Sequence, residues 1–250
     1  MSTSDYSTRK QACDATPAVE LSAVSKVFGP SVALRDATAD FAQGKLHVIV
    51  GENGAGKSTL LRIIAGLMKP TRGRVAVFGS ADLREMAERI GYMPHAPLLY
   101  DQLSGLENLR YTACLYGIDD ERRCHDVIEA VQLDPKLRRR VGQYSQGMRQ
   151  RLSLARAIVH DPALLLLDEP FSNVDPGSAQ HMVDALATLR DAGRTVVLIT
   201  HQPALLDGVA DNYVSMEAGR ITDQGGSAPA RSAQFTSTVS LRMEWRSDDL

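Results

Sequence analysis

The residues with the clearest chemical meaning form the stretch Gly51–Ser58, which reads G-x-x-x-x-G-K-S. An apolar run, Leu46–Val50, precedes it, and a helical pattern, Thr59–Ala65, follows it. Between a strand and a helix, glycines let backbone N–H groups turn toward phosphate oxygens, and the positive end of the helix strengthens the attraction. The lysine then reaches the β- and γ-phosphates, and the serine hydroxyl ligates Mg²⁺. The sequence therefore predicts a nucleoside triphosphate site formed by Gly51, Asn53, Gly54, Ala55, Gly56, Lys57, Ser58 and Thr59.

Further polar residues directly follow apolar runs or begin a helical pattern. Asp168-Glu169 comes after Ala163–Leu167, a continuous apolar run that is typical of a central parallel strand covered on both faces. His201 comes after a second such run, Thr195–Thr200. Ser145 has the chemistry of a helix N-cap, and the residues after it give a helix with one apolar face.

Together these stretches resemble the motifs of ATP-binding cassette (ABC) ATPases. Tyr144–Leu152 resembles the family's signature sequence in a degenerate form, and Leu164–Pro170 resembles its acidic strand end. Ser172–Asp175 is similar to the loop just beyond that strand, and Thr200-His201 to the switch histidine. The stretches stand in the family's order, and the resemblance covers about residues 18 to 222. It implies an α/β P-loop NTPase core with a mostly parallel sheet, an antiparallel β subdomain and an inserted helical subdomain.

The resemblance gives the acidic pair and the histidine catalytic roles. Asp168 is expected to hold Mg²⁺ through water, and Glu169 to polarise the attacking water. Adjacent carboxylates at a buried strand end would repel each other unless a cation lay between them, which favours a Mg²⁺ site over an incidental pair. His201 is expected to hydrogen-bond the γ-phosphate and to orient the same water.

The signature helix implies a second copy of the chain. In this fold, a helix that begins at Ser145 cannot reach its own P-loop. The family presents that helix N-terminus, here Ser145 and Gly147, to the ATP of a second cassette, where N–H groups and the helix dipole meet the γ-phosphate. Asp175 is assigned to the same nucleotide-binding set. Because the chain holds one cassette, we expect a head-to-tail homodimer with ATP between the subunits.

The loop Tyr92–Pro97 departs from the family pattern. The family has a glutamine there that senses Mg²⁺ and touches the membrane subunit, whereas this sequence has His95. An imidazole nitrogen is a poor ligand for Mg²⁺, so the departure weakens the usual metal contact at His95. The expected role of the loop as a coupling surface is unchanged.

The same loop suggests which transporter the chain serves. Pro94–Asp101 and His201-Gln202-Pro203 resemble the ATP-binding subunit of the haem exporter of cytochrome c biogenesis, in which a histidine often replaces the glutamine. Exporters of drugs, polysaccharides and lipids share most of this pattern, so an exporter of another substrate stays open.

Composition limits the other classes of protein. The net charge is −2 and aromatic residues make up 5%, which argues against a nucleic-acid surface. The three cysteines lack C-x-x-C spacing and are expected to be free thiols. No apolar run approaches the roughly 18 residues of a membrane span, and the N-terminus lacks a signal-peptide core. If the chain works at a membrane, it depends on another subunit, and the ABC resemblance implies attachment to the cytoplasmic face of the inner membrane through a polytopic membrane subunit.

Three alternatives explain less of the sequence. A glycine-rich turn that carries Lys-Ser by coincidence does not account for both flanks of the motif. A non-transport ABC ATPase usually carries two cassettes, a coiled coil or a basic surface. A GTPase would need an Asn-Lys-x-Asp motif, which is absent, and a small-molecule kinase has no use for the signature helix.

The expected division of the chain follows from these motifs. Residues 1–17 are predicted to be a disordered leader, 18–222 the ATPase domain with its helical subdomain at about 86–161, and 223–250 a polar tail that includes Trp245. Composition also predicts a helix over Ala81–Arg89. Phe28 is a candidate to stack on adenine from a turn, although a single aromatic more often packs in the core.

Overall fold

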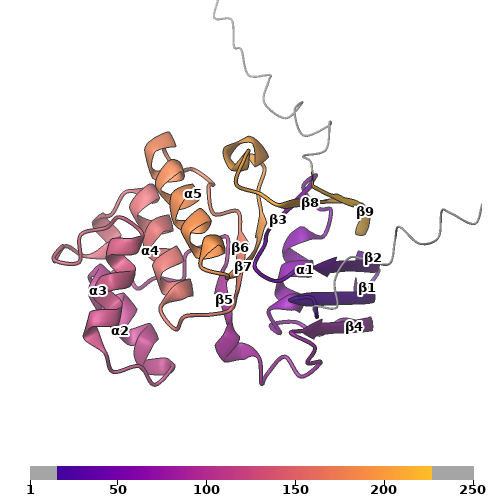
Figure 1. Cartoon of the computed structure of the whole chain (residues 1–250), viewed down its shortest axis with the longest axis horizontal. Helices are drawn as coiled ribbons and strands as arrows, with labels where there is room; N and C mark the ends of the chain where they lie inside the picture. The colour runs from indigo at the N-terminus through magenta and orange to yellow at the C-terminus, as the bar shows by residue number, and fades with distance from the viewer. Residues whose placement is uncertain (1–15, 227–250) are drawn as a thin grey trace, which may run out of the picture.

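The structure is a computed structural model and describes residues 16–226. Trp245, most of the predicted leader and most of the predicted tail lie outside the described residues. Two β-sheets with helices between and beside them make up this part of the chain (Figure 1).

A six-stranded sheet supplies the edge on which the predicted site residues lie. Its first five strands are parallel, and the last pairs antiparallel at the edge, as expected for a terminal hairpin. The residues of β6 and β7 are all buried, which confirms two central strands covered on both faces. In spatial order the strands are β5 (Ile90–Met93), β6 (Leu164–Asp168), β7 (Thr195–Ile199), β3 (Leu46–Gly51), β8 (Asn212–Glu217) and β9 (Arg220–Gly225).

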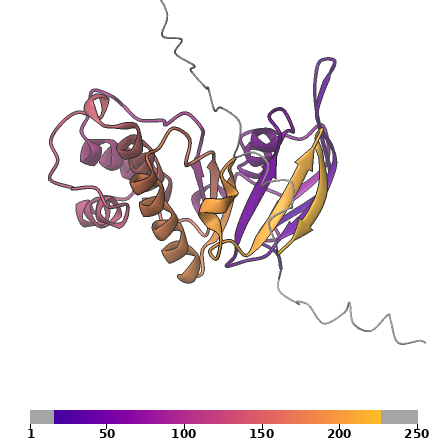
Figure 2. The same cartoon turned by 90° about the horizontal axis from the view of Figure 1, so that it is seen from above.

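A three-stranded antiparallel sheet packs on one side of this core. Its strands β2 (Ser31–Phe41), β1 (Val19–Phe28) and β4 (Arg72–Val77) are hydrogen-bonded in that order. The buried apolar face of α1 (Lys57–Ile64) packs in one hydrophobic cluster with residues of both sheets. Figure 2 shows the same layering from above. The helix that follows the predicted phosphate loop is therefore fixed from two sides.

The remaining α-helices lie on the other side of the six-stranded sheet, at the left of Figure 1. Each N-cap side chain accepts a hydrogen bond from a backbone N–H of the first turn, which explains where the helices begin. Their apolar faces share a second hydrophobic cluster with strand residues such as Leu165 and Leu198. The helices are α2 (Gly105–Leu115), α3 (Glu121–Ala130), α4 (Gln146–Ile158) and α5 (Pro176–Asp191).

Two local predictions were wrong. The predicted helix over Ala81–Arg89 is only a 3-10 turn, Ala87–Arg89, preceded by turns. The Ser80 hydroxyl accepts from the Asp82 N–H at 3.2 Å and the Asp82 carboxylate from the Arg84 N–H at 3.0 Å. Such local side-chain bonds satisfy the backbone without a helix. Phe28, which the sequence placed in a turn, is instead the last residue of β1.

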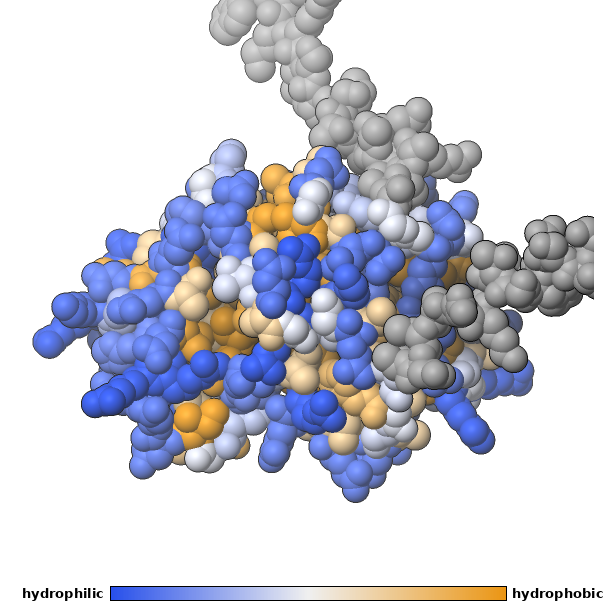
Figure 3. Space-filling model, in the orientation of Figure 1, coloured by the Kyte–Doolittle hydropathy of each residue, from blue (hydrophilic) through white to orange (hydrophobic). Residues whose placement is uncertain are grey.

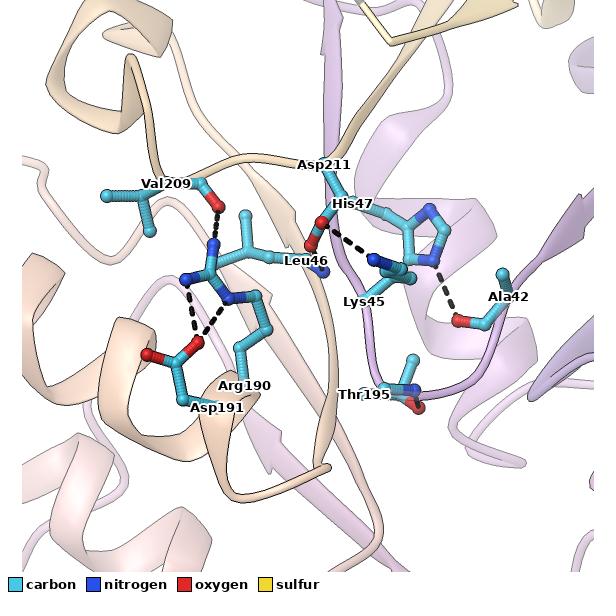
Figure 4. Close-up of polar contacts among 10 residues, drawn as sticks. Ala42, Lys45, Leu46, His47, Arg190, Asp191, Thr195, Val209 and Asp211 are labelled. Carbon is cyan, nitrogen blue, oxygen red and sulfur yellow. Dashed lines mark hydrogen bonds and ion pairs between the residues drawn. The ribbon is translucent and has the colours of Figure 1, made fainter.

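The end of β3 that lies farther from the phosphate loop is held by charged groups (Figure 4). Asp211 accepts from the Leu46 N–H at 2.8 Å and from Lys45 Nζ at 3.1 Å. Although burial favours the neutral acid, these two partners hold the pKa of Asp211 below its usual value. Arg190 hydrogen-bonds the Val209 carbonyl and so ties the end of α5 to the same corner. The strand that delivers the phosphate loop is thus pinned at its start.

Polar side chains cover most of the face drawn in Figure 3, around several separate hydrophobic areas. Within residues 16–226, no helix has the length and apolar character that a membrane span requires.

Candidate functional site

The loop Gly51–Ser58 curls at the start of α1 in a conformation that requires glycine. Gly56 has φ 93°, and a Cβ there would lie 2.3 Å from the Ala33 carbonyl oxygen. Gly54 has φ 82°. Both values lie in the region that glycine adopts at no steric cost. No side chain caps α1, and no acidic residue stands in its first turn, so the N–H groups there are available to an anion.

Lys57, the predicted phosphate-binding cation, hydrogen-bonds the backbone of its own loop. Lys57 is 6% exposed, and its Nζ donates to the carbonyls of Gly51 at 2.7 Å and Glu52 at 2.9 Å. Burial lowers the pKa of Lys57, and the nearby carboxylates of Glu169 and Asp168 oppose that shift. An arriving phosphate would offer this ammonium an anionic partner in place of neutral carbonyls.

The predicted metal pair is brought together by α1, which carries Ser58, and the end of β6, which carries Asp168. The Ser58 hydroxyl donates to Asp168 Oδ1 at 3.0 Å. Asp168 is 1% exposed, and its Oδ2 has no hydrogen-bond partner among the described residues. An unpaired buried carboxylate oxygen is costly, and Mg²⁺ prefers oxygen ligands. The two side chains therefore fit a Mg²⁺ ion.

Glu169 and His201 meet because β6 and β7 are paired, with Asp168 opposite Ile199. His201 Nε2 lies 3.2 Å from Glu169 Oε1, and the His201 backbone N–H donates to Oε2 at 3.3 Å. The Glu169 backbone adopts φ 55°, which is uncommon for a non-glycine residue. The carboxylate and the imidazole are thus in direct contact beside the phosphate loop.

One cavity of about 560 Å³ collects most of the predicted residues. His95 is exposed and lines the cavity, so its loop reaches the same space as the acidic pair. Sequence reasoning missed Ala33, which approaches Gly56 from β2 and which no local pattern could identify. The cavity is lined by Ala33, Asn53, Gly54, Ala55, Gly56, Lys57, Ser58, Thr59, His95, Asp168, Glu169, Ser172 and His201.

Phe28 does not line this cavity and does not pack in the core. Its side chain is 47% exposed, and Lys26 Nζ lies 5.1 Å from the ring centroid. The core interpretation of this aromatic is wrong. The side chain is therefore partly exposed at the surface.

A second group of predicted residues comes together outside the cavity. Ser145 caps α4 as predicted, by accepting from the Met148 N–H at 3.2 Å. Asp175 caps α5, and the hydrogen bond from the Ser178 N–H lowers its pKa. A Cβ at Gly147 would lie 2.4 Å from Ser178 Oγ, so the two helix starts touch. Neither Ser145 nor Asp175 lines the cavity around Lys57.

Comparison with known proteins identifies the family. The ABC transporter family profile matches residues 34–172, which is more than half of the 250 residues. The chain belongs to the ABC transporter family. The ABC transporter ATP-binding protein NatA of Bacillus subtilis is 33% identical over 200 residues, 77% of this chain and 81% of that protein. The bacitracin transport ATP-binding protein BcrA of Bacillus licheniformis is 31% identical over 205 residues, 80% of this chain and 67% of that protein.

Solved structures agree with this assignment of the ABC cassette. The ATP-binding subunit of an ABC transporter has a TM-score of 0.75 at 29% identity, covering 83% of this chain and 89% of its own. A dimeric post-hydrolysis state of the ATP-binding cassette MJ0796, bound to ADP and Pi, has a TM-score of 0.75 at 25% identity. That likeness covers 83% of this chain and 98% of the other. The ABC cassette described here is therefore an ATP-binding and ATP-hydrolysing subunit of an ABC transporter.

Proposed function

We propose that this subunit hydrolyses Mg-ATP in a head-to-tail homodimer and thereby drives a polytopic membrane subunit at the cytoplasmic face of the inner membrane. One observation carries the proposal. The phosphate cradle and the signature helix start lie on the same chain, yet only the cradle lines the cavity. A second copy is the simplest source of a helix start for the open side of that cavity.

Within the cavity, the side chains divide the work by their chemistry. Lys57 and the free N–H groups at the start of α1 bind the phosphates. Ser58 and Asp168 hold Mg²⁺, which when bound neutralises phosphate charge. Glu169 takes the proton of the attacking water, and His201, 3.2 Å from that carboxylate, orients the same water.

Residues outside the cavity complete the proposed site from the partner. The first turn of α4 contains no acidic residue, so its positive end is not neutralised by its own helix. Ser145 and Gly147 present that end to the other subunit's γ-phosphate, and Asp175 supports it through the contact at Ser178.

Phe28, exposed at the end of β1, stacks on adenine.

Exposed apolar side chains next to the His95 loop support a protein partner. Tyr100 and Tyr111 contact each other with ring centroids 5.1 Å apart, and they are 49% and 48% exposed. Leu115, four residues after Tyr111 on the same face of α2, is 70% exposed. We assign this surface to contact with the membrane subunit. We take residues 18–222 as one domain, whose helical subdomain at about 86–161 makes that contact.

We propose export of haem for cytochrome c biogenesis as the specific task, because His95 and His201-Gln202-Pro203 resemble that subfamily. The alternative is export of another substrate. It is favoured by relatives named for bacitracin transport and daunorubicin resistance.

The test is to co-express the chain with a candidate polytopic membrane subunit and to measure ATPase activity of the complex in nanodiscs. Co-purification and stimulation above the isolated subunit are expected. Addition of haem should stimulate further, whereas a response to drugs or lipids but not to haem would favour the alternative. An isolated chain that never hydrolyses Mg-ATP and binds no membrane subunit would contradict the whole proposal.

A further inference from the structure

Tyr100–Ser104, the segment that follows the His95 loop, contacts the region around the start of the signature helix. These contacts are not part of the phosphate site. Arg149 Nη1 lies 2.7 Å from Asp101 Oδ1 and donates to the Val141 carbonyl at 3.2 Å. Arg149 is 22% exposed and Asp101 54%, so the pair is partly shielded on the arginine side. We call Tyr100–Ser104 together with Arg140–Arg149 the clip.

Backbone hydrogen bonds hold the same two segments of the clip together. The Gly142 N–H donates to the Asp101 carbonyl at 3.0 Å, and the Val141 N–H donates to the Leu103 carbonyl at 2.8 Å. A Cβ at Gly142 would lie 3.3 Å from the Asp101 carbonyl oxygen, so the two segments would have to shift slightly to accept a side chain there. The ion pair between Arg149 and Asp101 is thus one of several contacts that hold the two segments of the clip together.

On its other side the clip is fixed to α2. Asn108 is 1% exposed, and its side chain accepts from the Tyr100 N–H at 2.8 Å. It also donates to the carbonyls of Tyr100 at 3.0 Å and Ser104 at 2.9 Å. A buried amide with these three bonds has little freedom, because each broken bond would leave a buried polar group unpaired. Tyr100–Ser104 therefore moves with α2.

We infer that Asp101 is a positioning residue that transmits the position of the His95 loop to the start of α4. This inference rests on the head-to-tail dimer proposed above. Arg149 stands one turn after Ser145, and its N–H donates to the Ser145 carbonyl at 2.9 Å. Asp101 follows the cavity-lining His95 by six positions. A membrane subunit that docks on the loop thus acts, through Asp101, on the helix start that meets the other subunit's ATP.

The test uses Glu169→Gln as the parent chain, because it is expected to hold ATP between two subunits. Asp101→Asn removes the charge, Asp101→Glu keeps it, and Asp119→Asn is the matched control. Asp119 is an exposed acid between α2 and α3 with no ion pair among residues 16–226. The readouts are the ATP concentration for half-maximal dimerisation by light scattering, and binding of a fluorescent ATP analogue to the monomer.

Asp101→Asn should raise the ATP concentration for half-maximal dimerisation about threefold to tenfold and leave analogue binding to the monomer unchanged. Asp101→Glu and Asp119→Asn should stay near the parent. Arg149→Gln should weaken dimerisation too, and the double variant should be no worse than Arg149→Gln alone, because the two residues act as one pair.

Two failures are distinguishable. A parent that dimerises with ATP, together with an Asp101→Asn variant that does so at the same concentration, overturns this inference and leaves the dimer standing. A parent that stays monomeric in saturating ATP overturns the dimer and the inference with it. Should Asp101→Asn prove unstable by thermal melting, additive effects in the Asp101→Asn/Arg149→Gln double variant would count against the pair.

Discussion

Two helix starts in this cassette are built differently, although both are aimed at phosphate in the proposed mechanism. The start of α1 lies in the cavity, has no side-chain cap, and stands beside a lysine that is 6% exposed. The start of α4 is capped by the exposed Ser145, and neither Ser145 nor Gly147 lines that cavity. The first is shaped by its own fold to bind an anion, whereas the second has a stable local geometry and no acidic residue in its own first turn.

The difference separates binding from catalysis. One cassette can bind ATP with the groups around α1, because they all come from one chain and meet in one cavity. In the proposed dimer, hydrolysis at the γ-phosphate uses the positive end of α4 from the other copy. Changes at α1 should therefore show in a monomer, and changes at α4 should show only in the dimer.

The largest effect on ATP binding is expected from Lys57→Ala. The substitution removes a buried cation that contacts the loop carbonyls and is placed to meet the phosphates. Loss of one partner of a buried charge pair costs roughly 2–5 kcal/mol, so ATP affinity should fall about 30-fold or more. Isothermal titration with Mg-ATP measures this directly. Wild-type affinity in a folded Lys57→Ala chain would place the phosphates elsewhere.

Glu169→Gln should affect the chemical step and spare binding. The amide keeps the size of the side chain near His201 but cannot take a proton from water. A missing general base typically lowers rates about 10²–10⁴-fold. Steady-state ATPase assays and titration of ATP binding measure the two quantities separately. If the variant hydrolyses ATP at the wild-type rate, the assignment of Glu169 as the base is wrong.

Ser145→Arg tests the second helix start. A bulky cation at this exposed position should block the ATP-dependent dimer of the Glu169→Gln chain and leave ATP binding to the monomer unchanged. Ser145→Ala is the matched control. Loss of an N-cap costs about 1 kcal/mol of stability, so this control should weaken the dimer only modestly. Normal ATP-dependent dimerisation of Ser145→Arg would contradict the head-to-tail arrangement.

The two regions also differ in how well the sequence predicts them. Gly51–Ser58 is a local motif between a strand and a helix, so its loop, its lysine and the metal pair with Asp168 were predictable from spacing and strand order. The fold class was predictable from the resemblance of these motifs to the ABC family. The hydrogen bonds from Lys57 Nζ to the carbonyls of Gly51 and Glu52 were not predictable, because they depend on the shape of the folded cavity.

Contacts between distant segments explain the remaining gaps. Ser145 was predictable as an N-cap, but the approach of Gly147 to Ser178 joins two helices that no sequence pattern pairs. Ala33 reaches the loop from another sheet. The error at Ala81–Arg89 has a smaller cause, since composition counts helix formers but not the side-chain bonds of Ser80 and Asp82.

The smallest effect is expected from His95→Gln, which lies between the two regions. His95 is exposed and lines the cavity, and an imidazole nitrogen is a poor ligand for Mg²⁺. We therefore expect the loop to serve mainly in coupling, with water completing the metal shell. A glutamine restores the oxygen donor, so basal hydrolysis by the isolated subunit should stay the same or rise modestly.

The same substitution should alter stimulation of hydrolysis by the membrane subunit, because the loop leads into the exposed surface at Tyr100 and Tyr111. The competing view makes His95 a direct reader of the γ-phosphate. It predicts a large fall in basal rate. Basal ATPase activity measured for wild type and His95→Gln separates the two views. If His95→Gln lowers the basal rate tenfold, roughly 1.4 kcal/mol of transition-state stabilisation, His95 acts in the phosphate site and its assignment to coupling is wrong.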